Sequence, residues 1–120
     1  MTDAYHALLE RKRELSPDAG FLVPAEDLDE GLFDWQRRIV AWALRRGRAA
    51  CFADTGLGKT RMQAEWARTV SEHANAPVLI LAPIAVAQQT IAEAARIGVE
   101  IEHSRDGKHG GGVVIANYER

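Results

Sequence analysis

One stretch decides the fold: the run ADTGLGKT at Ala53–Thr60. It matches the phosphate-binding pattern G-x-x-x-x-G-K-(S/T) at every fixed position except the first, where Ala53 replaces glycine. Glycine lets successive backbone N–H groups turn toward phosphate oxygens, and the start of the next helix adds about half a positive charge. In such loops the lysine reaches the β- and γ-phosphates and the hydroxyl binds Mg²⁺. We therefore expect Lys59 and Thr60 to bind the phosphates and Mg²⁺ of a nucleoside triphosphate.

The residues on either side of the loop fit this interpretation. The apolar run Ala49–Ala53 precedes it and predicts a short strand. A helix is expected from about Gly58, because Met62, Trp66 and Val70 recur at helical spacing. Strand, loop and helix in this order are what phosphate binding requires. The alternative is an ordinary glycine-rich turn that carries a surface lysine.

The rest of the chain alternates helices with short apolar strands, which predicts an α/β fold with a parallel sheet covered on both faces. The residue before Pro17 should end the first helix, Asp34 is a good N-cap for the second, and Gly47 suits its C-terminal end. The expected helices are Thr2–Leu15, Asp34–Arg46 and Ala85–Ile97, and the expected further strands are Pro77–Leu81, Val99–Glu102 and Val113–Ala116.

The same periodicity suggests which side chains form the core. In the second helix, Trp35, Ile39 and Trp42 fall on one side at helical spacing, so we expect this side to face the core. Trp66 is expected in the core for the same reason. Cys51, in the strand before the phosphate loop, should also pack internally.

Composition sets broad limits. The chain has 120 residues, enough for one small domain, and its net charge of −2 excludes a strongly basic nucleic-acid-binding protein. A single cysteine excludes a disulfide framework. No apolar run approaches the roughly 20 residues that cross a bilayer, and the charged start lacks a signal peptide's apolar stretch. We therefore expect a cytoplasmic protein.

Four stretches together resemble the motifs of superfamily 2 helicases and Swi/Snf-type ATPases, including phage members, in the family's order. Asp54–Thr60 resembles motif I, in which a second glycine before GKT and an alanine at the first position are common. Leu32–Gln36 resembles the Q-motif, and Leu79–Pro83 resembles motif Ia. Ile115–Glu119 is similar to the I-T-N-Y-E stretch beside the nucleic-acid groove.

The resemblance implies a RecA-like P-loop NTPase domain at residues 32–120, incomplete, preceded by a helical extension and loop at residues 1–31. It also implies an ATP-dependent helicase or translocase that hydrolyses ATP with Mg²⁺ and acts on nucleic acid, with DNA favoured over RNA. Gln36 would read the adenine edge, and Thr60 would hold Mg²⁺ through the nucleotide. The implied nucleotide-binding residues are Gln36, Asp54, Thr55, Gly56, Leu57, Gly58, Lys59, Thr60 and Arg61, and the implied nucleic-acid contacts are Pro83, Asn117 and Tyr118.

The acidic pair that holds Mg²⁺ and orients the attacking water in such motors follows the N-Y-E stretch in the family. We expect it beyond Arg120, because Asp29-Glu30 lies in a loop with no apolar strand before it. The chain is therefore expected to be the N-terminal piece of a longer protein that is cytoplasmic or, if it is phage-encoded, located in the host cytoplasm. Its partner would be the remainder of its own chain, with the acidic strand and a second RecA-like domain. Alone, this piece should bind nucleotide weakly and hydrolyse it negligibly.

Two other classes of function fit the phosphate loop. One is another P-loop ATPase, such as a packaging motor or a small-molecule kinase, and the other is a non-catalytic nucleotide-binding module. His103, Asp106 and His109 are expected in a solvated loop rather than a metal site, since they lack zinc-like ligand spacing. The arginines between Arg37 and Arg48 are expected to form a solvated face.

Overall fold

The computed structural model describes residues 3–8, 18–51, 58–104 and 111–117. Residues 3–8 are helical, as expected for the start of the chain. Apart from a short 3-10 helix over Ala25–Asp27, which the sequence did not predict, the remaining helices and strands lie within a few residues of their predicted positions. The elements are η1 (Ala25–Asp27, the 3-10 helix), α2 (Asp34–Arg46), α3 (Lys59–Ala74), β1 (Val78–Ala82), α4 (Ile84–Ala95), β2 (Ile101–His103) and β3 (Val113–Asn117).

The strands form a three-stranded parallel sheet in the order β1-β3-β2. In the register, Ala82 of β1 pairs with Asn117 of β3, and His103 of β2 pairs with Ile115. β1 and β2 are consecutive in the chain but separated in the sheet by β3, and α4 makes the crossover between them. The expected mixed α/β fold with a parallel sheet is confirmed, whereas residues 49–51 do not form the predicted strand.

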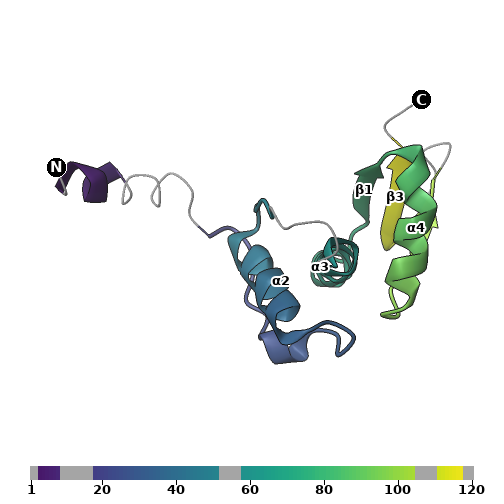
Figure 1. The fold of residues 1–120 in the computed structure, drawn as a ribbon, viewed down its shortest axis with the longest axis horizontal. Coiled ribbons are helices and arrows are strands. Elements are labelled where there is room, and N and C mark those ends of the chain that lie inside the picture. The colour runs from purple at the N-terminus through teal and green to yellow at the C-terminus, as the bar shows by residue number, and fades with distance from the viewer. Residues whose placement is uncertain (1–2, 9–17, 52–57, 105–110, 118–120) are drawn as a thin grey trace.

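Helices α3 and α4 contact the sheet and share one core cluster with it. Figure 1 shows α3 between α2 and β1, with α4 beside β3. On β1, Ile80 and Ala82 are buried, but Leu79 and Leu81 are 60% and 59% exposed. The expectation that helices cover both faces therefore fails at these leucines. The shared cluster consists of Ala64, Ala67, Ile80, Ala82, Ala87, Ala94, Ile97, Val99, Ile101, Val113 and Ile115.

A second core cluster joins α2 and the loop before it to the other side of α3. The buried residues of α2 are Gln36, Val40 and Leu44, whereas Trp35 and Trp42 are each 40% exposed. The prediction that the tryptophan side of this helix faces the core is thus wrong, because the loop leucines and α3 pack on the adjacent side. Trp66 is partly buried and packs against both clusters. The second cluster consists of Leu28, Leu32, Val40, Leu44 and Met62.

Backbone groups from the preceding segment close the C-terminal end of α2. The N–H groups of Ala19, Gly20 and Phe21 donate to the last carbonyls of the helix, at 3.0–3.1 Å. These groups satisfy acceptors that a helix end otherwise leaves unpaired. Gly20 is required for this approach, since a Cβ there would lie 1.6 Å from the carbonyl oxygen of Leu44. The segment is thereby fixed against α2.

A buried carboxylate ties α3 to the loop that precedes α2. Glu65 has no exposed surface, and its Oε2 accepts a hydrogen bond from the backbone N–H of Asp29 at 2.5 Å. Its Oε1 pairs with the guanidinium of Arg68, also at 2.5 Å. Partial burial lowers the pKa of Arg68, but the hydrogen bonds and charges of Glu65 and then Glu72 outweigh this effect and raise the pKa.

The residues that the structure describes include no helix long and apolar enough to span a bilayer.

We predict that Glu65→Ala lowers the free energy of unfolding by about 3 kcal/mol, because it unpairs a buried N–H and removes the partner of a half-buried cation. Glu72→Ala is the matched control, since Glu72 pairs with the same arginine but its side chain is 67% exposed. That variant should lose less than about 1 kcal/mol. Denaturant unfolding of both variants measures the difference, and equal losses would contradict the assigned role of Glu65.

Candidate functional site

The start of α3 presents several hydrogen-bond donors. Gly58 precedes the helix in the left-handed conformation, with φ 74° and ψ 31°, and no side chain of the described residues caps the helix there. The first helical hydrogen bond runs from the N–H of Met62 to the carbonyl of Gly58, at 3.2 Å. Lys59 is exposed and Thr60 is half-buried at this end. An ammonium group, a hydroxyl group and the N–H groups of the first turn therefore lie together, a donor set that fits nucleotide phosphates and Mg²⁺.

Gln36 lies beside this helix start. It is 4% exposed, and its Oε1 accepts a hydrogen bond from the backbone N–H of Phe33 at 2.8 Å. Phe33, rather than the expected Asp34, is the N-cap of α2. A Cβ built on Gly58 would lie 2.2 Å from Nε2 of Gln36, so the carboxamide touches the backbone of that glycine. Two residues that the sequence assigns to one nucleotide site are thus in contact, although 21 positions separate them.

Arg61, also expected at the nucleotide, is engaged by α4. Its Nε donates to Oε2 of Glu93 at 3.1 Å, and both side chains are about a third exposed. Arg96 approaches the other oxygen of the same carboxylate at 3.7 Å. In this arrangement Arg61 ties the first turn of α3 to α4. The other expected site residues Asp54, Thr55, Gly56, Leu57 and Tyr118 lie outside the described residues.

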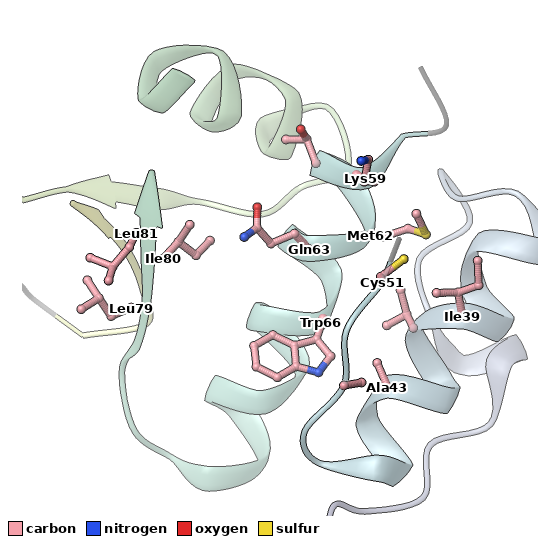
Figure 2. A pocket seen from close by; sticks show the side chains of 13 residues that line it. Ile39, Ala43, Cys51, Lys59, Met62, Gln63, Trp66, Leu79, Ile80 and Leu81 are labelled. Carbon is pink, nitrogen blue, oxygen red and sulfur yellow. The ribbon is translucent and has the colours of Figure 1, made fainter. Parts of the chain in front are cut away.

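A cavity of about 480 Å³ opens between α2, α3 and β1. Figure 2 shows Lys59 at the N-terminal end of α3, with Trp66 lower on the same helix, and Ile80 on the side of β1 that faces α3. Cys51 also lines the cavity and is exposed, so its expected core position is wrong. The cause is local, because residues 49–51 are not paired into the sheet. The remaining lining is largely apolar: Ile39, Val40, Ala43, Ala49, Thr60, Met62, Gln63, Leu79 and Leu81.

Three residues lie at the carboxyl ends of the parallel strands and therefore at one edge of the sheet. Pro83 follows β1, Asn117 ends β3, and His103 ends β2 instead of lying in the predicted loop. Nδ1 of His103 lies 3.4 Å from Nε2 of Gln88. Nε2 of His103 and Oδ1 of Asn117 are buried, and neither has a hydrogen-bond partner among the residues that the structure describes.

Sequence reasoning missed Glu65 and the position of His103. The signal for Glu65 was an acidic residue among neighbours that all pack internally, Ala64 and Ala67 in the cluster with the sheet and Met62 in the cluster with α2. The signal for His103 was weaker, because a three-residue strand is too short to show alternation. His103 and Asn117 lie on neighbouring parallel strands, so their proximity depends on how β2 and β3 pair.

Asn117→Ala should leave the free energy of unfolding unchanged or raise it by about 1 kcal/mol, because the side chain buries an acceptor without a protein partner. Val114→Ala, on the same strand, is the control. Its side chain is 3% exposed, and the variant should lose about 2 kcal/mol. Thermal and denaturant unfolding distinguish the two, and a loss above about 1 kcal/mol for Asn117→Ala would mean that the amide has a structural role.

Within the described ranges, no three His, Cys, Asp or Glu side chains gather closely enough to hold a metal ion. Comparisons with protein-family models, with curated proteins and with solved structures found no match to this chain.

Proposed function

We propose that this chain is the ATP-binding portion of a RecA-like motor. The motor would be a helicase or translocase that hydrolyses ATP and acts on nucleic acid, with DNA favoured over RNA. The observation that carries the proposal is the start of α3, where a helix led by a left-handed glycine presents Lys59 and then Thr60. The sequence pattern at Ala53–Thr60 supports the same assignment.

Each described group has a part in binding the triphosphate. The exposed ammonium of Lys59 neutralises charge on the β- and γ-phosphates, and the N–H groups of the first turn donate to phosphate oxygens. The hydroxyl of Thr60 is a ligand suited to Mg²⁺, which would supply further charge neutralisation when bound. These groups bind and orient the phosphates, whereas water activation is assigned to an acidic pair elsewhere in the polypeptide.

Nucleic acid is proposed to lie along the carboxyl edge of the sheet. Pro83 and Asn117 stand at the ends of adjacent parallel strands, and ligands of open α/β sheets bind at that edge. The amide of Asn117 could donate to a backbone phosphate oxygen without reading a base. Binding through such groups would be independent of sequence, as a motor requires.

A further strand of the same polypeptide is proposed to pair with β1. In the described part of the chain β1 pairs only with β3, so the main-chain groups of its second edge have no strand partner. Leu79 and Leu81 are exposed on one face of the same strand, and the cavity between α2, α3 and β1 lies beside it. A strand carrying the acidic pair would extend the sheet at the second edge of β1 and bring carboxylates toward Lys59.

Lys59→Ala should weaken Mg²⁺–ATP binding by at least about tenfold, since a charge-assisted contact contributes about 1.5–3 kcal/mol. Calorimetric titration of the parent and the variant measures the loss. The melting temperature should not change, because Lys59 is exposed. Arg38→Ala is the control, an exposed cation on α2 that should bind ATP as the parent does. Affinities within threefold of each other for parent and Lys59→Ala would refute the phosphate site.

The complete gene product should hydrolyse ATP faster when single-stranded DNA is present. Asn117→Ala should reduce this stimulation more than the basal rate, because the residue is assigned to the nucleic acid and not to the nucleotide. DNA affinity should fall with salt at a slope of about −0.7 per contacted phosphate, measured at two or more salt concentrations. An ATPase rate that is the same with and without DNA or RNA would favour a kinase or a regulatory module instead.

A further inference from the structure

We propose that Gln36 is a positioning residue for the phosphate end of the nucleotide: through Gly58 it fixes the first turn of α3, and its effect on binding does not depend on the base. The inference rests on the proposed function, since it concerns the same site. This role differs from the adenine-reading role that the sequence implies for Gln36, and the two roles predict different results in the first test below.

The carboxamide of Gln36 is held from the side of α2. Its Oε1 accepts from the N–H of Phe33 at 2.8 Å, three residues earlier. This bond satisfies one of the N–H groups that a helix start leaves unpaired, in the manner of the returning half of a capping box. With 4% of the residue exposed, the side chain has little freedom to rotate. Its contact with the start of α2 therefore restricts its position.

The other end of the same carboxamide lies on the backbone of Gly58. A Cβ at position 58 would be 2.2 Å from Nε2 and 3.5 Å from Cδ of Gln36, so the contact exists only because this residue is glycine. Gly58 also has φ 74°, a conformation that side chains rarely adopt. Its carbonyl accepts the first helical hydrogen bond of α3, from Met62. A fixed Gly58 therefore fixes the turn that carries Lys59 and Thr60.

Reading adenine requires an amide that faces the base with its donor and its acceptor together. In Gln36 the acceptor is directed to the start of α2 and the amide is packed against Gly58. Loss of this side chain should loosen the turn that binds phosphate, and phosphate is common to all nucleoside triphosphates. The expected loss of affinity is therefore the same for different bases.

The first test compares ATP, GTP and inorganic triphosphate, each with Mg²⁺, in calorimetric titrations of the 120-residue chain. Gln36→Ala should weaken all three by the same factor, about three- to tenfold. Gln36→Met, which keeps the length of the side chain but lacks the amide, should show the same loss. It replaces Gln36→Ala in this test if that variant folds poorly. Gln89→Ala, which changes an exposed glutamine on α4, is the control and should bind as the parent does. A loss confined to ATP would overturn the proposal and restore the base-reading role.

The second test needs no nucleotide, so it separates failure of this inference from failure of the proposed function. Amide hydrogen exchange at Met62 should speed up in Gln36→Ala and Gln36→Met but not in Gln89→Ala. Gly58→Ala should destabilise the chain less when combined with Gln36→Ala than when made alone, because the clash with the carboxamide is then gone. Unchanged exchange at Met62 together with additive effects would overturn the positioning role, even if the parent binds ATP. A parent that binds no triphosphate, with exchange changed as expected, would overturn the proposed function and leave the contact established.

Discussion

Glu65 lies in the middle of α3 with no exposed surface, and its two carboxylate oxygens face different parts of the chain. One oxygen accepts a hydrogen bond from the N–H of Asp29 in the loop before α2. The other accepts a hydrogen bond from Arg68, which also lies on α3. A buried carboxylate is tolerated only when its oxygens are satisfied, so the loop and the helix must meet in one register. Because Lys59 and Thr60 begin the same helix, this register also determines where the candidate phosphate-binding groups stand.

Helix α3 is therefore the common support of two structures that would otherwise be separate. Its alanines, Ala64 and Ala67, face the sheet and α4, where the absence of larger side chains allows close approach. Met62 faces α2, and Trp66 contacts both clusters. The contact between Gln36 and Gly58 joins the starts of α2 and α3, and the pair of Arg61 with Glu93 joins α3 to α4. The proposed site is thus supported by helix–helix contacts on two sides.

Local patterns in the sequence predicted α2, α3, α4 and the three strands of the sheet, but they missed η1 and wrongly placed a strand at residues 49–51. The bounds of α2 follow from the proline-free run between Asp34 and Gly47, and β1 follows from an uninterrupted apolar run before Pro83. The patterns did not identify the buried side of α2, because Trp35 and Val40 lie on adjacent faces and both are apolar. Which face is buried depends on Leu28 and Leu32, which pack against Val40 and Leu44 in the tertiary structure.

The same limit applies to the candidate site. The motif predicted Lys59 and Thr60 at a helix start, because a phosphate loop is read from consecutive residues. The approach of Gln36 to Gly58 could not be derived in the same way, since it depends on how two helices are placed. Cys51 was expected inside because its neighbours are apolar, but the run at residues 49–51 forms no strand and the thiol is exposed.

The open edge of β1 has a consequence for the chain in solution. The strand Val78–Ala82 carries no charge, no proline and no bulge that would discourage pairing with another molecule. Short segments with high β-propensity and little charge are the usual starting points of cross-β assembly. Chains whose β1 edge is uncovered should therefore self-associate more as concentration rises, and a charged substitution at Leu79 or Leu81 should suppress this. The further strand proposed to pair with this edge would also protect the polypeptide from aggregation.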